Sequence, residues 1–329
     1  MTKYTIKAPS QLNASINLPA SKSISNRALV ISAMAGSHIQ PDNLSDCDDT
    51  EVIVAALQNM PEVINIKAAG TAMRFMTAYL SATPGEHTIT GTERMQNRPI
   101  GILVDALRYL GAVKPQPYKE TSYMIENDWS ASSYWYEMMA LNGNIDSSIQ
   151  LEGLMDCSKQ GDSVVKYIFS LLGVKSEFEN HDHLSNVMLK ANRCLLPKFD
   201  YDFSGSPDLA QTIVVACCAL GVKFRFTGLA SLKIKETDRI EALKTELKKV
   251  GYVIHDENDN TLYWDGETCD PSFAPIDTYE DHRMAMAFAP LAFKFPQIEI
   301  NNPEVVSKSY PHYWEDLKKV GFEIIESEE

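Results

Sequence analysis

The stretch Ile240-Glu-Ala-Leu-Lys-Thr-Glu-Leu-Lys-Lys-Val-Gly251 contains a unit that repeats through this chain. It is an amphipathic helix pattern that ends in an apolar–glycine–apolar stop, and glycine is the residue that a left-handed helix C-cap favours. The pattern returns at residues 104–111, 164–173 and 313–321, and a degenerate copy at 51–60 has Pro61 in place of the glycine. Repetition at this interval indicates one supersecondary unit per copy.

A strand and a second helix precede each of these helices in the predicted unit. Alternating apolar and polar residues predict strands at 87–91, 149–153, 224–228 and 298–302. The preceding helices are more apolar, and we expect them at 25–35, 71–82, 130–141, 207–220 and 281–293. We interpret the apolar helices as core and the amphipathic helices as outer cover. The chain thus has five copies of helix–strand–loop–helix–strand, which predicts an α/β fold.

Composition sets limits on the partners of the protein. The 329 residues are enough for two domains, and hydrophobic residues at 44% with charged residues at 22% are normal for a globular protein. A formal net charge of −14 argues against a nucleic-acid partner, which requires clustered cations. An acidic protein that binds an anion must therefore gather its cations in one cleft.

We expect neither a metal site nor a membrane segment. The six cysteines include no Cys-x-x-Cys pair, which fits a reducing cytoplasm without disulfides or zinc. His181-Asp-His183 could hold a metal, but it lies in a polar loop with no third ligand nearby. No apolar segment follows Lys3 and Lys7 as in a signal peptide, and the longest apolar run, residues 213–222, is too short to span a bilayer.

The segment Leu18-Pro-Ala-Ser-Lys-Ser-Ile-Ser-Asn-Arg27 has the composition of an anion site. Lys22 and Arg27 lie among serines at the start of an apolar helix pattern. Free N–H groups, hydroxyls and fixed cations at a helix N-terminus favour phosphate or carboxylate. An ordinary capped helix with solvated cations is the alternative.

Four further segments have a similar composition at or before predicted helix starts. They are Ala69-Gly-Thr-Ala-Met-Arg74, Glu93-Arg-Met-Gln-Asn-Arg98-Pro-Ile-Gly101, Lys235-Glu-Thr-Asp-Arg239 and Asp281-His-Arg-Met-Ala-Met286. Glycine lets a ligand approach the backbone closely, and arginine binds carboxylate or phosphate through two N–H groups. Lys308, in Ser307-Lys-Ser-Tyr-Pro, adds a cation to a further loop. A solvated helix entry would also explain residues 235–239, and simple surface would explain Lys308.

Together and in this order, the five helix-start segments resemble the 5-enolpyruvylshikimate-3-phosphate synthase (3-phosphoshikimate 1-carboxyvinyltransferase) family over residues 18–314. The resemblance implies a two-domain fold, an inside-out α/β barrel of repeated βαβαββ-type units. It implies transfer of the enolpyruvyl group of phosphoenolpyruvate to the 5-hydroxyl of shikimate 3-phosphate, with release of phosphate. It also implies that no metal or organic cofactor is needed, and that the enzyme acts in the cytoplasm on small molecules.

The same resemblance assigns roles to individual residues. Asp208 matches the catalytic aspartate and Glu236 the catalytic glutamate, while Lys22 reaches both substrates. Shikimate 3-phosphate is expected to contact Ser23, Arg27 and Lys235. Phosphoenolpyruvate is expected to contact Gly70, Arg98, Arg239, Arg283 and Lys308. As a hypothesis, Asp208 serves the hydroxyl and Glu236 serves C3, because the reaction needs an acid and a base close together.

The chain departs from the family in one respect: we count five units where the family has six. The missing residues belong to the first domain, which we place at 20–123, with the second domain formed by 1–19 and 124–329. A Ser-Ser-Gln segment that binds shikimate 3-phosphate in family members is lost with these residues. Ser132-Ser-Tyr134 does not replace this segment. Ala68 is a further difference, because many members have asparagine at that position. We therefore expect weaker binding of shikimate 3-phosphate, and exposed faces through which an otherwise monomeric chain could associate.

Two alternatives remain beside this function. A related enolpyruvyl transferase acts on UDP-N-acetylglucosamine, but it has a loop cysteine that residues 93–97 lack. A non-catalytic anion-binding protein is the other alternative, because the catalytic residues are present while a substrate-binding unit is not.

Overall fold

The computed structural model describes residues 2–36, 41–97, 100–110, 123–181 and 184–328, which divide into two compact units. The larger unit consists of Met1–Leu18 and Trp129–Glu329, and the smaller unit of Pro19–Asp128. Each has its own hydrophobic core. The domain boundaries expected from the sequence stay a prediction.

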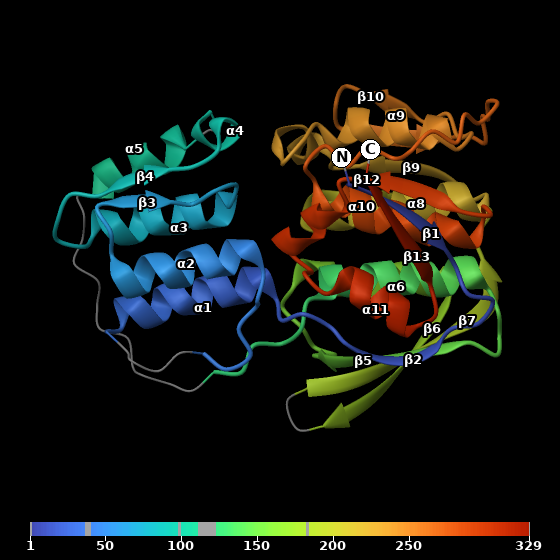
Figure 1. Cartoon of the computed structure of the whole chain (residues 1–329), viewed down its shortest axis with the longest axis horizontal. Helices are drawn as coiled ribbons and strands as arrows, with labels where there is room; N and C mark the ends of the chain where they lie inside the picture. The colour runs from blue at the N-terminus through green and yellow to red at the C-terminus, as the bar shows by residue number, and fades with distance from the viewer. Residues whose placement is uncertain (1, 37–40, 98–99, 111–122, 182–183, 329) are drawn as a thin grey trace. The chain divides into compact units, whose positions relative to one another are not determined.

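Three buried inner helices form the centre of the larger unit: α6 (Trp129–Asn142), α8 (Ala210–Leu220) and α10 (His282–Phe288). Helix α8 packs against both α6 and α10 (Figure 1). All residues of α8 up to Ala219 are buried, because its run of Ile, Val, Ala and Cys has no polar face. The single helix predicted at 281–293 is wrong in its second half. Residues Ala289–Phe293 form a 3₁₀ segment, since Pro290 cannot donate an α-helical hydrogen bond.

Three sheets cover these helices, in the strand orders β2–β5–β7–β6, β10–β11–β9–β8 and β12–β1–β13. Helix α6 contacts β5, β6 and β7, α8 contacts β9, and the 3₁₀ segment after α10 contacts β1 and β12. Two of the sheets are thus paired with the inner helices α6 and α8, and the third with the 3₁₀ segment that continues α10. The strands are β1 (Thr2–Lys7), β2 (Asn13–Asn17), β5 (Ser148–Leu154), β6 (Leu172–His181), β7 (Leu184–Leu195), β8 (Lys198–Asp202), β9 (Lys223–Thr227), β10 (His255–Glu257), β11 (Thr261–Trp264), β12 (Ile298–Asn301) and β13 (Glu323–Glu328).

The outer helices of the larger unit are α7 (Val165–Ser170), α9 (Arg239–Lys249) and α11 (Tyr313–Lys319). The glycines after α9 and α11 have φ values of 96° for Gly251 and 99° for Gly321, as the predicted left-handed stops require. Helix α7 instead ends before Gly173, which lies in β6 with φ 94°. In the degenerate copy at residues 51–60, which has no glycine stop, Met60 adopts the left-handed conformation, with a φ of 39°.

The smaller unit contains α1 (Lys22–Met34), α2 (Asp48–Asn59), α3 (Gly70–Ser81), α4 (Glu93–Gln96) and α5 (Gly101–Leu110), with β3 (Val63–Asn65) and β4 (Thr88–Thr90). Helices α1, α2 and α3 contact one another. Strands β3 and β4 form a parallel sheet of only two strands. Apolar side chains reach the surface here, since Ile31 is 48% and Val63 58% exposed. Loss of a neighbouring unit would leave such exposed side chains.

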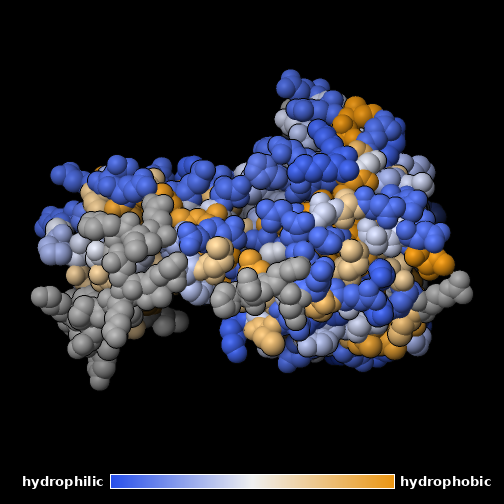
Figure 2. All heavy atoms as spheres, turned by 90° about the horizontal axis from the view of Figure 1, so that it is seen from below, coloured by the Kyte–Doolittle hydropathy of each residue, from blue (hydrophilic) through white to orange (hydrophobic). Residues whose placement is uncertain are grey.

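Hydrophilic side chains predominate on the face that Figure 2 shows, with apolar side chains scattered among them. In the described ranges, no helix is both long and apolar enough to cross a membrane. Nor do three or more His, Cys, Asp or Glu side chains of those ranges gather as metal ligands. His183, which the sequence analysis considered as a ligand, lies outside the described residues.

Glu137 is a buried carboxyl group in the middle of α6. Its side chain is fully buried, and neither carboxyl oxygen has a hydrogen-bond partner among the described residues. Burial raises the pKa of Glu137 well above its ordinary value of 4.5. The folded protein therefore keeps a proton on Glu137 at a pH where the unfolded chain has lost it.

The free energy of unfolding should therefore fall as the pH rises above 4.5, because the folded state then binds more protons than the unfolded state. We expect Glu137→Gln to remove this contribution, which amounts to about 1.4 kcal/mol per pH unit. Urea unfolding at pH 5, 6, 7 and 8 measures the slope. Glu304→Gln, at an exposed position, is the control. Parallel slopes for the wild type and Glu137→Gln would contradict the prediction.

Candidate active site

The guanidinium group of Arg239 is the centre of a charged cluster in the larger unit. Its side chain is 1% exposed. Nε donates to Asp281 Oδ2 at 2.6 Å, Nη1 to Asp208 Oδ1 at 2.9 Å, and Nη2 to Glu236 Oε2 at 2.8 Å. One buried cation therefore holds three carboxylates, and two of them are the predicted catalytic pair.

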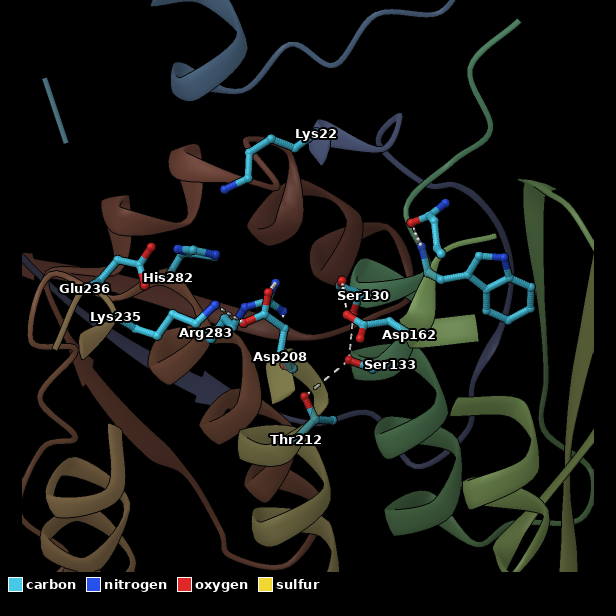
Figure 3. Close-up of polar contacts among 12 residues, drawn as sticks. Lys22, Ser130, Ser133, Asp162, Asp208, Thr212, Lys235, Glu236, His282 and Arg283 are labelled. Carbon is cyan, nitrogen blue, oxygen red and sulfur yellow. Dashed lines mark hydrogen bonds and ion pairs between the residues drawn. The ribbon is translucent and has the colours of Figure 1, made fainter. Parts of the chain in front are cut away.

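Three helix starts supply these residues. Asp208 lies in a 3₁₀ turn, Pro207–Leu209, that leads into α8. Arg239 is the first residue of α9. Asp281 caps α10, accepting a hydrogen bond from the backbone N–H of Arg283 at 2.9 Å. Segments far apart in sequence therefore meet at one place in the larger unit, and Figure 3 shows Asp208, Lys235, Glu236 and Arg283 together there.

Asp208 is an ionised carboxylate within reach of solvent, since its side chain is 32% exposed. Burial alone would raise the pKa of Asp208, but the charges of Arg283, Arg239 and Lys235 outweigh it and hold the pKa well below its usual range. Lys235 Nζ lies 3.3 Å from Oδ1, and Arg283 Nη2 lies 3.2 Å from Oδ2. The carboxylate can accept a hydrogen bond from a ligand hydroxyl.

The charges of this cluster balance. Arg239, Arg283 and Lys235 contribute three positive charges, and Asp208, Glu236 and Asp281 three negative ones. The sequence predicted that cations gather in one cleft. Three of the predicted cations do meet in the larger unit, where three carboxylates pair with them. An incoming anion must therefore compete with Asp208 and Glu236 for the same donors.

Arg283 and Lys308 extend the site beyond the Arg239 cluster. Arg283 Nη1 donates to the Asp208 carbonyl at 3.2 Å and to the Tyr134 hydroxyl at 3.4 Å. Burial raises the pKa of Tyr134 to about 12, so its hydroxyl stays protonated. Lys308 ends the 3₁₀ segment Pro303–Lys308, and its ammonium donates to the Glu280 carbonyl at 2.7 Å. Glu280 directly precedes Asp281, which connects Lys308 to the cluster through the backbone.

In the smaller unit, the predicted ligands lie at two helix starts. Lys22 begins α1, and its ammonium lies 3.2 Å from Asp49 Oδ2. Arg27 Nη1 donates to the Ser23 carbonyl at 2.6 Å, so both residues occupy the first two turns of α1. The Arg27 guanidinium also lies 5.4 Å from the ring centre of Phe75 on α3.

Gly70 is the first residue of α3, and its carbonyl accepts a hydrogen bond from Arg74 Nη1 at 3.3 Å. Arg98 lies outside the described residues. The role of each of these residues toward a substrate stays a prediction.

Several polar groups at the start of α6 were not expected from the sequence as part of the site, and no substrate contact was expected from residues 132–134. Ser130 Oγ donates to Asp162, and Ser133 Oγ lies 3.2 Å from Thr212 Oγ1 on α8 (Figure 3). Tyr134, which contacts Arg283, belongs to the same helix. One signal was available: Ser130 lies at the start of an inner helix, as Asp208 does.

The buried Arg239 is expected to contribute strongly to stability. Arg239→Met leaves Asp281, which is fully buried, without its ion-pair partner. The free energy of unfolding should fall by about 3–5 kcal/mol. Arg225→Met is the matched control, because it breaks the exposed pair with Glu257 and should cost much less. Equal small losses in urea unfolding of both variants would contradict this role for Arg239.

Comparison with known proteins gives relatives over nearly the whole chain. The family model described as EPSP synthase (3-phosphoshikimate 1-carboxyvinyltransferase) matches residues 6–63, 58–114 and 112–317. A curated 3-phosphoshikimate 1-carboxyvinyltransferase of Bacteroides fragilis is 47% identical over 415 aligned positions, covering 99% of this chain and 100% of that protein. The 3-phosphoshikimate 1-carboxyvinyltransferase of Photobacterium profundum is 27% identical, and the alignment covers 97% of this chain and 99% of that protein.

The alignment with the Bacteroides protein is longer than the chain. At least 86 of its positions (415 − 329) have no residue of this chain. The second and third segments that match the family model overlap at residues 112–114, soon after α5. The count of five repeat units stays a prediction.

Solved structures show the same fold. EPSP synthase from Acinetobacter baumannii has a TM-score of 0.73 and 16% identity, covering 100% of both chains. The enolpyruvyl transferase NikO from Streptomyces tendae has a TM-score of 0.53 and 14% identity, covering 99% of each. The fold is therefore that of the enolpyruvyl transferases. The matches to the family model and to the curated relatives show that this chain belongs to the EPSP synthase (3-phosphoshikimate 1-carboxyvinyltransferase) family of transferases.

Proposed function

We propose that this protein transfers the enolpyruvyl group of phosphoenolpyruvate to the 5-hydroxyl of shikimate 3-phosphate and releases inorganic phosphate. The observation that carries the proposal is the pair of carboxylates, Asp208 and Glu236, held by one buried guanidinium. The names of the relatives favour this function over transfer to UDP-N-acetylglucosamine and over simple anion binding.

In the proposed addition step, the 5-hydroxyl oxygen attacks C2 of phosphoenolpyruvate while C3 gains a proton. Asp208 accepts the hydroxyl proton, and Glu236, which must be in its protonated form in the substrate complex, delivers its proton to C3. In the elimination step, C3 returns a proton to Glu236, the bond between C2 and the phosphate oxygen breaks, and Asp208 passes the hydroxyl proton to the departing phosphate. Both carboxyl groups thereby regain the forms with which the reaction began. General acid–base catalysis of this kind contributes about 10²–10⁴-fold to a rate.

Substrate charge gives Asp208 its basicity in this proposal. In the free protein three cations hold the pKa of Asp208 low, which makes it a weak base. The carboxylate and phosphate of the substrates draw Arg239, Arg283 and Lys235 toward themselves. The pKa of Asp208 then rises, because its stabilising charges are shared. Lys22, Ser23, Arg27, Gly70, Arg98 and Lys308 are the further proposed ligands.

Turnover tests the proposal directly. Purified protein should release phosphate when both substrates are present, and Asp208→Asn and Glu236→Gln should each lower kcat by about 10²-fold or more. Because C3 gains its proton in the same step in which the hydroxyl attacks C2, Glu236→Gln should lose the exchange of solvent hydrogen into the C3 methylene of phosphoenolpyruvate. Asp200→Asn, at an exposed position on β8, is the control. A folded wild type without phosphate release would contradict the function, and normal exchange by Glu236→Gln would contradict its role.

Shikimate 3-phosphate should bind more weakly to this chain than to a full-length relative. The chain lacks at least 86 positions of the alignment with the Bacteroides enzyme, and we propose that they include the Ser-Ser-Gln contacts to this substrate. Loss of two hydrogen bonds to a charged ligand corresponds to about 10²-fold or more in Kd. Calorimetric titration of both proteins measures the ratio, and equal values would contradict the expectation.

A further inference from the structure

A strained turn directly precedes the Arg239 cluster. The Asp281 N–H donates to the Thr278 carbonyl at 2.8 Å and closes the turn. Both central residues have positive φ, 53° at Tyr279 and 55° at Glu280. Asn, Asp and Gly normally fill such positions, because a Cβ is crowded there. The left-handed conformation is unfavourable for a residue with a Cβ, so the surrounding structure must hold this turn in place.

A buried carboxylate holds the outer side of the turn. Glu246 on α9 is fully buried. Its Oε1 accepts a hydrogen bond from the Tyr279 hydroxyl at 2.6 Å, and its Oε2 accepts one from the Asp277 N–H at 3.0 Å. Lys249 Nζ lies 2.7 Å from Oε2 and 2.8 Å from Asp277 Oδ2. Burial and the neighbouring Glu246 raise the pKa of Tyr279, so its hydroxyl remains a donor.

The other side of the turn carries the groups of the proposed reaction. The Glu280 carbonyl accepts the hydrogen bond from the Lys308 ammonium at 2.7 Å. The next residue, Asp281, binds Arg239 and caps the helix that presents Arg283. The left-handed backbone at residues 279 and 280 therefore lies between the anchor on Glu246 and three cations of the site.

We propose that Glu246 and Tyr279 are positioning residues, which hold this strained turn so that Lys308 and Arg239 keep their places. Neither residue need touch a substrate. The strain has a structural reason here: glycine at position 279 would relax the backbone but would lose the hydroxyl that reaches Glu246. The part of the inference that concerns catalysis rests on the function proposed above. The part that concerns the turn does not.

Hydrogen exchange tests the turn without any substrate. The reporters are the N–H groups of Asp281 and Arg283, because their own acceptors are Thr278 and Asp281 and not the altered groups. Tyr279→Phe and Glu246→Gln each remove or weaken a hydrogen bond to a charged group. Exchange at both reporters, followed by NMR, should become about tenfold faster or more.

Two further variants make this measurement specific. Lys244→Met on the same helix α9 breaks ion pairs with Glu241 and Asp256 only, and should leave both reporters unchanged. Glu280→Gly in the Tyr279→Phe background should restore most of the protection, because glycine adopts positive φ without strain. Unchanged exchange in both Tyr279→Phe and Glu246→Gln would overturn the proposal, and so would equal acceleration in Lys244→Met.

Ligand binding then tests the link to the site. Tyr279→Phe should weaken the binding of phosphoenolpyruvate about tenfold. In turnover, the substitution should raise KM more than it lowers kcat. In a Lys308→Met background the same substitution should have a smaller effect on binding, because the part of the effect that acts through Lys308 is already lost. Full additivity would overturn this link. A wild type that binds no phosphoenolpyruvate would contradict the proposed function, while the exchange measurement would still decide the role of Glu246 and Tyr279.

Discussion

The arrangement of the larger unit depends on one buried positive charge. A guanidinium group that is 1% exposed must be matched by carboxylates, because an unpaired ion in a protein interior costs several kcal/mol. Arg239 meets this requirement with three partners that come from the starts of three helix segments. The same pairing that keeps the interior neutral brings the two proposed catalytic carboxylates together. Stability and chemistry thus depend on the same contacts.

Charge balance also shapes how the site can bind its ligands. The three cations and three carboxylates of the cluster cancel, so the free protein does not store a large positive potential there. In the proposed mechanism, a substrate anion takes hydrogen-bond donors from Asp208, and the pKa of that carboxylate rises when a base is needed. The turn at Tyr279 and Glu280 adds a mechanical constraint, since its left-handed backbone is held by Glu246. Backbone strain of this kind is frequent at functional sites.

The smaller unit differs from the larger one in a way that bears on function. Its described sheet has two strands, whereas the sheets of the larger unit have three or four strands each. The chain also lacks at least 86 positions of its alignment with the Bacteroides enzyme. Small units bury a smaller share of their surface and are less stable. The residues proposed for catalysis lie mainly in the larger unit, and those proposed for holding shikimate 3-phosphate mainly in the smaller one.

Local sequence determined most of the inner and outer helices, four of the strands, the glycine stops at Gly251 and Gly321 and the motifs that resemble the family, because these depend on periodicity and on residue types at short spacing. The family resemblance that these motifs support also indicated Asp208, Glu236, Arg239 and Arg283 as site residues. Only the tertiary structure decided that these four residues share their charges, that Tyr134 joins them from α6, and that Met60 replaces a glycine. It alone showed the left-handed turn held by Glu246. Ion pairing and backbone strain arise from contacts between segments far apart in the chain, and a local pattern carries no information about such contacts.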